Sequence, residues 1–309
     1  MKPFEMPRIY SEEELTRIAA KATQRFVEER HAAEYALAEQ YHEVFARASM
    51  GVAHVMQVTD NLEHLREKGT DLLTDGYLDT LRSMVRPTVS EDDFKNLSST
   101  GTTGRTKFHD PELSAAALDY VQRNLNLDLF PWLEDGEEPS ASDIHAASVS
   151  IAALMAEQRT KTAMRGGASH KQESLVKDTL AERCHYKRIV GADFDIQMHA
   201  PRPGELFDGE TKVADTKADV VFGLYDGRFM CLECKVSNSE VNSFKRLNHE
   251  AVEKTKQWES QFGKQCVSGA VLKGCFKPAN LLSAQESGTF LFWSDSLDPL
   301  VDFVERTRR

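Results

Sequence analysis

Two carboxylates and an ammonium group converge in a predicted β-hairpin in the second half of the chain. Asp219 begins one apolar run, Glu233 and Lys235 lie near the end of a second, and Asp226-Gly227 marks the turn between them. Side chains two residues apart share a face of a strand, so closing the hairpin brings Asp219 level with the other two. Two acids there can hold a divalent metal ion, and the lysine can orient or deprotonate a water. Two metal-binding carboxylates and a lysine beside them are the groups that can hydrolyse a phosphodiester.

A simpler interpretation of these charges stays open at this point. Asp219 and Lys235 could form a cross-strand ion pair, with Glu233 solvated on an exposed edge. Both runs, however, are almost continuously apolar. Because charges in such strands usually need a partner or a metal ion, the functional interpretation is favoured.

The spacing of Asp219 and Glu233-Cys-Lys235 resembles the PD-(D/E)XK nuclease superfamily, although Ala218 stands where that motif has proline. The resemblance covers the chain from about Ser169 to its end. It implies an α/β (α+β) fold with a restriction-endonuclease-like core, in which helices flank a mixed β-sheet. It also implies Mg²⁺, one or two ions per active site, bound by Asp219 and Glu233.

A narrower resemblance lies in the run Glu233-Cys-Lys-Val-Ser-Asn-Ser-Glu-Val-Asn-Ser-Phe-Lys-Arg-Leu-Asn248, together with the later Gln-Trp, Ala-Val-Leu and Phe-Trp segments. These look like type II restriction endonucleases, and most like the XamI family. The implied activity is sequence-specific cleavage of double-stranded DNA by a homodimer, leaving 5′-phosphate and 3′-hydroxyl ends. A structure-directed or repair nuclease on the same core, and an inactive nucleic-acid-binding module, are the alternatives.

Helices and strands around the hairpin are predicted from capping signals and apolar spacing. Ser169-His-Lys-Gln172 fits a capping box and begins a helix to Cys184, with Glu173 on its inward stripe. In the superfamily an acid on this helix often joins the metal site, but a first-turn glutamate also simply favours the helix dipole. An amphipathic helix over 241–262 has charged residues on its outer face, among them Glu250 and Lys254. Strands over 266–272 and 289–293 and helices over 278–285 and 297–306 complete the set.

Polar and basic residues near the hairpin and in two loops have the chemistry to contact DNA phosphates or base edges. After the second strand these are Ser237, Asn238, Ser239, Asn242, Ser243, Lys245 and Arg246. The predicted loop 161–171 adds Arg165, His170 and Lys171, and the loop 98–107 adds Arg105 and Lys107. An ordinary turn in which Ser239 or Asn242 caps the next helix, and solvated loops, are the alternatives. The loop 98–107 lacks the spacing of a nucleotide-binding P-loop, so no nucleotide cofactor is expected.

The first half of the chain is predicted to be helical. Ser11-Glu-Glu-Glu14 is a capping box that begins a helix to about Met50 or beyond, and further helices are expected over 70–84, 111–124 and 142–161. We therefore expect a helical domain at 1–140, which embraces DNA, forms a dimer or simply packs as a bundle. A catalytic domain follows at 141–309.

Composition limits the class of protein. The net charge of −11 argues against a non-specific DNA coat, so we expect a local basic groove on an acidic body. No apolar run reaches the roughly 18 residues of a membrane span, and no secretory signal is evident, so the prokaryotic cytoplasm is the expected location. The five cysteines are expected to be buried free thiols rather than zinc ligands.

Overall fold

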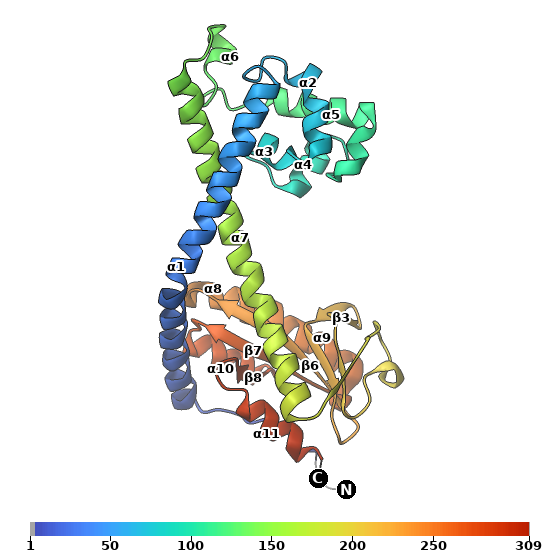
Figure 1. Cartoon of the computed structure of the whole chain (residues 1–309). Helices are drawn as coiled ribbons and strands as arrows, with labels where there is room; N and C mark the ends of the chain where they lie inside the picture. The colour runs from blue at the N-terminus through green and yellow to red at the C-terminus, as the bar shows by residue number, and fades with distance from the viewer. Residues whose placement is uncertain (1–3, 309) are drawn as a thin grey trace. The chain divides into compact units, whose positions relative to one another are not determined.

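The computed structural model of the chain describes residues 4–308, apart from the side chains at positions 165 and 166. Its contacts divide the chain into two compact units (Figure 1). The sheet unit takes Met1–Ala33 and Arg165–Arg309, and the helical unit takes Glu34–Met164. The two longest helices, α1 (Glu12–Val58) and α7 (Ala141–Arg183), each contribute residues to both units.

A six-stranded mixed sheet forms the centre of the sheet unit, in the order β1-β2-β5-β6-β7-β8. The strands β1/β2, β6/β7 and β7/β8 pair in parallel, whereas β2/β5 and β5/β6 pair antiparallel. Their bounds are β1 Lys187–Ile189, β2 Glu205–Phe207, β5 Val220–Gly223, β6 Phe229–Ser237, β7 Cys266–Gly274 and β8 Phe290–Trp293, and a separate two-stranded sheet joins β3 (Thr211–Val213) to β4 (Thr216–Ala218). The predicted mixed α/β architecture is confirmed.

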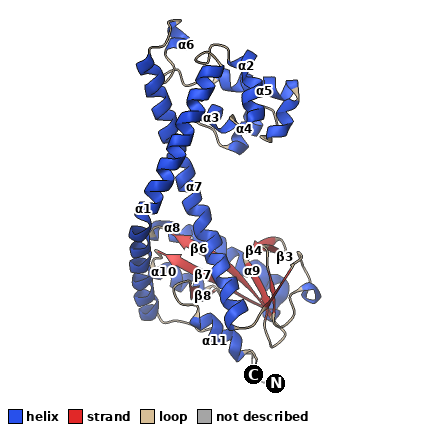
Figure 2. Cartoon of the chain, viewed as in Figure 1, coloured by secondary structure: helices blue, strands red, loops and turns tan. Residues whose placement is uncertain are grey.

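Helices cover both faces of this sheet (Figure 2). One face packs against the last turns of α7 and against α11 (Asp298–Arg306), with Val176 and Leu180 contributed by α7. The other face packs against α10 (Pro278–Glu286), α9 (Val252–Phe262) and the first turns of α1. Short 3₁₀ turns occupy Gln197–His199 and Gly263–Gln265.

The predicted hairpin is confirmed, and its turn explains the register of β5 and β6. Gly227 has a φ of +88°, a conformation that glycine adopts at no steric cost. The pairing runs from Gly223 opposite Phe229 to Val220 opposite Leu232. Continuing this register by one residue sets Asp219 opposite Glu233.

The helix α7 corrects two sequence-based predictions. Helices over 142–161 and 171–184 were expected, with a loop between them and a capping box at Ser169, but a single helix runs through the whole segment. Two adjacent glycines inside a helix cost roughly 1 kcal/mol each. Apolar contacts on either side offset this cost, since Ile151 is buried in the helical unit and Val176 in the sheet unit.

The predicted helix over 241–262 is continuous but not uniform. It consists of α8 (Glu240–Phe244), the π-helical segment η3 (Lys245–Ala251) and α9. Leu247, Thr255 and Trp258 lie on the buried side of this amphipathic helix, whereas Phe244 is 49% exposed. π-Helical turns change the phase of the residues that follow and occur frequently at functional sites.

The helical unit contains α2 (Leu65–Asp75), α3 (Leu78–Ser83), α4 (Glu91–Leu97), α5 (Pro111–Arg123), α6 (Trp132–Asp135) and the 3₁₀ helix η1 (Arg105–His109). The predicted start of α1 is confirmed, because Glu14 N–H donates to Ser11 Oγ while Ser11 N–H donates to Glu14 Oε2. The start of α5 is confirmed too, since Asp110 caps it. The helix expected over 70–84 is interrupted after α2, where Gly76 has a φ of +94°.

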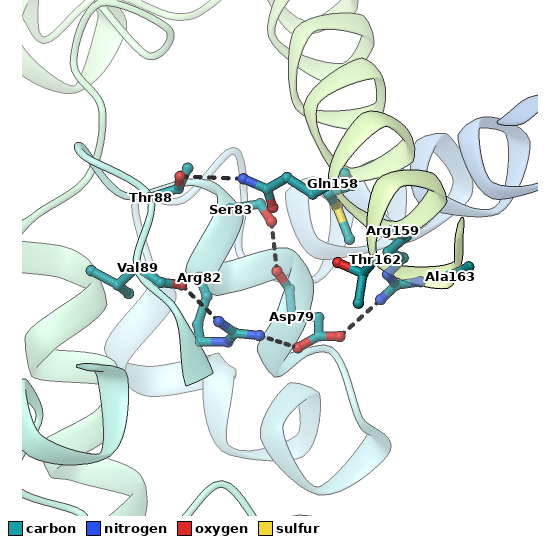
Figure 3. A pocket seen from close by; sticks show the side chains of 10 residues that line it. Asp79, Arg82, Ser83, Thr88, Val89, Gln158, Arg159, Thr162 and Ala163 are labelled. Carbon is teal, nitrogen blue, oxygen red and sulfur yellow. Dashed lines mark hydrogen bonds and ion pairs between the residues drawn. The ribbon is translucent and has the colours of Figure 1, made fainter. Parts of the chain in front are cut away.

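A cavity of ≈ 400 Å³ in the helical unit is lined by residues of α3, α7 and the segment between α3 and α4. At its edge the carboxylate of Asp79 lies between two guanidinium groups, 2.6 Å from Arg82 and 2.9 Å from Arg159 (Figure 3). Arg82 also donates to the carbonyl oxygen of Val89 at 2.7 Å. These contacts tie α3 to α7.

Charge is distributed unevenly between the two units. The helical unit contains 22 acidic and 11 basic residues, a net charge of −11, whereas the rest of the chain contains 27 of each. No helix within residues 4–308 is long and apolar enough to cross a membrane.

Candidate active site

Asp219 is attached to the neighbouring strand through both its backbone and its side chain. Its N–H donates to the carbonyl oxygen of Leu232 at 3.2 Å, and its Oδ2 accepts a 2.7 Å hydrogen bond from the N–H of Cys234. Cys234 lies between Glu233 and Lys235 in β6. The structure therefore brings the acid of the first strand beside the acid and lysine of the second.

Glu233 is completely buried and is held by two ammonium groups. Its Oε2 lies 2.7 Å from Nζ of Lys235, and its Oε1 accepts a 2.8 Å hydrogen bond from Nζ of Lys254. Lys235 also lies 3.7 Å from Oε2 of Glu250. The alternative of an Asp219–Lys235 ion pair with a solvated Glu233 is therefore not what the structure contains.

Burial and mutual repulsion change the ionisation of this cluster. Burial, and then the charge of Asp219, raise the pKa of Glu233 even though two ammonium groups oppose the change. Burial of Lys235 opposes its charge, but Glu233, Asp219 and Glu250 outweigh burial and raise its pKa. Lys235 is consequently an ammonium ion at neutral pH, suited to orienting a water or stabilising an anion rather than accepting a proton.

Glu173 approaches the same place from α7. It lines a cavity of ≈ 400 Å³ together with His170, Lys177 and Asp219. Burial, and then the charge of Asp219, raise the pKa of Glu173. Asp219 thus acts electrostatically on both other acids.

The donor atoms of this cluster are all oxygens, which is the ligand type that Mg²⁺ prefers. In the described part of the chain, however, no group of three or more His, Cys, Asp or Glu side chains is arranged closely enough to hold a metal ion. Both carboxylate oxygens of Glu233 have ammonium partners instead.

The polar residues at the end of β6 and in the segment after it fall into two groups. Ser237 and Ser243 are buried: Ser237 donates to the carbonyl oxygen of Ser239, while Ser243 Oγ donates to Glu240 and accepts from Asn280. Ser239 caps α8, as one alternative for this segment predicted. The exposed members are Asn238, Asn242 and Lys245, with Arg246 half-buried.

The remaining DNA-binding candidates are dispersed. His170 lines the cavity beside Glu173, and Lys171 is exposed one residue later. The side chain of Arg165 lies outside the described residues. Arg105 and Lys107 belong to the helical unit, where Arg105 Nε donates to the carbonyl oxygen of Thr74.

Lys254 is a site residue that the sequence analysis missed. Its helix was expected to present it on the outer, charged face, but its Nζ reaches Glu233 and also donates to the carbonyl oxygen of Lys217 at 2.7 Å. The sequence feature that points to Lys254 is its spacing from Glu250. Glu250 and Lys254 are four residues apart on one side of a helix, next to the buried stripe, and they offer the opposite charges to Lys235 and Glu233.

Comparison with known proteins gives consistent results. A family model described as XamI restriction endonuclease matches residues 63–293, a range that includes the whole Asp219–Lys254 cluster. The chain is 31% identical over 224 residues to the type II restriction enzyme XamI of Xanthomonas campestris pv. amaranthicola, which covers 68% of this chain and 81% of that enzyme. No solved structure matches the chain.

Proposed function

The chain belongs to the XamI family of type II restriction endonucleases, and from this premise we propose that it is a Mg²⁺-dependent enzyme that cuts both strands of DNA at a specific sequence. The observation that carries the proposal is the Asp219–Cys234 hydrogen bond, because it holds one acid beside the Glu233–Lys235 pair. We further propose that the mixed sheet and its helices are a PD-(D/E)XK core, with Asp219, Glu233 and Lys235 as its motif.

Asp219 and Glu233 would bind the metal ion, with Glu173 as a third ligand, and the three carboxylates would have to come closer together than they lie in the described part of the chain. The electrostatics of the site support this assignment, since burial, and then the negative charge of Asp219, raise the pKa values of Glu173 and Glu233, and a bound cation would oppose both effects. A bound Mg²⁺ supplies a Lewis acid that favours hydroxide and neutralises charge on the phosphate.

Lys235 would position the attacking water and stabilise its hydroxide form, since its ammonium group is buried and charged. The oxygen of that water bonds to phosphorus in line with the P–O3′ bond. That bond breaks, the proton lost by the attacking water passes to solvent, and the departing 3′ oxygen takes up a proton from solvent. The products are a 5′-phosphate and a 3′-hydroxyl.

DNA would lie against the end of β6 that carries Lys235, where Asn238, Asn242 and Lys245 are exposed. The charge distribution supports this choice of surface. The helical unit carries the entire net charge of −11 and would repel a phosphate backbone, whereas the sheet unit carries no net charge. We therefore propose that the helical unit acts chiefly in dimerisation. Two identical subunits would cut the two strands of a palindromic site.

Cleavage of plasmid and linear DNA tests the proposal. With Mg²⁺ the wild-type protein should convert a linear DNA into discrete fragments, and Asp219→Ala and Lys235→Ala should leave the DNA intact. Asp215→Ala is a matched control, because Asp215 lies in the same segment with a fully exposed side chain (100%). Equal fragment patterns from the wild type and both site variants would overturn the assignment. Cutting confined to forks or junctions would replace sequence recognition by structure-directed cleavage.

A further inference from the structure

A second lysine contacts the buried carboxylate of the proposed active site. Glu233 has no exposed surface, and Lys254 approaches its Oε1 from α9 while Lys235 approaches Oε2 from the same strand. A buried carboxylate without partners would be strongly destabilising, so each ammonium group contributes to keeping it ionised. The two lysines are not equivalent, since Lys254 comes from a helix that packs on the sheet.

Lys254 also joins the segment that leads to Asp219 to the strand that carries Glu233. Besides Glu233 it contacts the carbonyl oxygen of Lys217, two residues before Asp219, at 2.7 Å. One ammonium group therefore bridges the segment that leads to Asp219 and the strand that carries Glu233. This contact and the Asp219–Cys234 hydrogen bond are two independent links that hold Asp219 and Glu233 at a fixed separation.

The π-helical segment η3 precedes Lys254 in the same continuous helix, with Glu250 in η3 and Lys254 in α9. Glu250 lies near Lys235 and Lys254 near Glu233, so acids and lysines alternate in a four-membered network. In such a network each charge faces an opposite charge, which fixes the side chains more firmly than a single pair.

We propose that Lys254 is a positioning residue of the active site, holding the Glu233 carboxylate and the Asp219 segment in the arrangement that cleavage requires. This inference rests on the proposed nuclease function. Lys254 acts through Glu233 and the carbonyl oxygen of Lys217, both of which its Nζ contacts. Its loss therefore slows the chemical step and leaves DNA binding intact.

Steady-state cleavage and DNA binding test this role in the full-length protein. Lys254→Met should lower kcat by about tenfold or more, because small displacements of catalytic groups are costly, while KM for DNA stays close to the wild-type value. Lys254→Arg should recover most of the activity, because a guanidinium group can donate to both oxygens. Lys256→Met is the matched control, since Lys256 is exposed two residues later in α9. Wild-type kcat in Lys254→Met, or equal losses in the two methionine variants, would overturn the proposal.

A metal-free measurement separates this inference from the proposed function. Urea unfolding of the wild type, Lys254→Met, Glu233→Gln and the double variant forms a double-mutant cycle. We expect Lys254→Met to be much less destabilising when Glu233 is already neutral, and simple additivity would refute the contact. Absence of cleavage by the wild type would refute the nuclease proposal, whereas the cycle would still decide whether Lys254 supports Glu233.

Discussion

Oδ2 of Asp219 accepts a 2.7 Å hydrogen bond from the backbone N–H of Cys234, the residue between Glu233 and Lys235. A side-chain carboxylate is thereby attached to the main chain of the neighbouring strand. The backbone of the sheet therefore holds this carboxylate in place, whereas a side chain without such a bond would rotate freely. Asp219 and Glu233 are thus organised before any ligand arrives.

Asp219→Asn should remove the negative charge of this residue while keeping its hydrogen bond to Cys234. The asparagine oxygen can still accept from Cys234, so thermal unfolding should match or exceed that of the wild type, since repulsion with Glu173 and Glu233 is removed. Cleavage should fall by about 10²–10³-fold, the usual loss when a preorganised electrostatic contact is removed. Wild-type cleavage in Asp219→Asn would show that the charge is dispensable, and Asp215→Asn controls for the substitution itself.

Glu173→Gln should stabilise the metal-free protein. Burial and Asp219 raise the folded-state pKa of Glu173, so its ionisation opposes folding at pH values above its ordinary pKa of 4.5. Below pH 4.5 the Glu173 carboxyl group is protonated in both the folded and the unfolded state, so it no longer opposes folding. The variant should therefore have a higher Tm than the wild type at pH 7–8, and this difference should vanish as the pH falls to 4.5. A lower Tm at pH 8 would contradict the assignment.

Lys245→Ala should weaken DNA binding in a salt-dependent manner. A lysine that contacts one phosphate releases about one counterion, so the slope of log affinity against log salt should decrease in magnitude by about one. Binding is measured with Ca²⁺ in place of Mg²⁺. Lys264→Ala is the control, because Lys264 precedes β7 at the end of the sheet far from Lys235. An unchanged slope in Lys245→Ala would exclude this lysine from the DNA surface.

Ser243→Ala should affect stability rather than DNA binding. The hydroxyl group is buried and accepts from Asn280 Nδ2 at 2.9 Å and from the N–H of Lys277 at 3.3 Å. Removing it takes one partner from two partly buried donors, which costs about 1 kcal/mol in the free energy of unfolding. Chemical denaturation measures this cost, with the exposed Ser260→Ala as control. A stable variant with weakened DNA affinity would instead assign Ser243 to the DNA surface.

Asp79→Asn should destabilise the protein modestly and only above acidic pH. Burial opposes ionisation of Asp79, but Arg82 and Arg159 outweigh it and lower its pKa. The charge therefore stabilises the folded state above the ordinary pKa of 3.8, and this stabilisation is lost as the pH falls through the lower folded-state pKa. Because the side chain is 50% exposed, the loss at pH 7 should stay below about 1 kcal/mol. Thermal unfolding at pH 7 and near pH 3 tests this, and an equal deficit at both pH values would contradict it.

The arrangement of Asp219 beside Glu233 and Lys235 was predictable from the sequence because it is local. A tight turn at Asp226-Gly227 fixes the register of two adjacent strands. The alternation of side chains along each strand then decides which residues share a face. Capping signals at Ser11 and Asp110 were reliable for the same reason, since their hydrogen bonds join residues at most three positions apart.

Only the tertiary structure decided the features that depend on distant packing. The continuity of α7 through its glycines depends on apolar contacts at both ends of the helix, which its local propensity does not include. The burial of Ser243 depends on α10, which follows later in the chain. Lys254 faces Glu233 rather than solvent because its helix packs on the sheet in one particular rotation about its axis. Hydrophobic periodicity alone does not specify which way a residue at the boundary of the apolar stripe points.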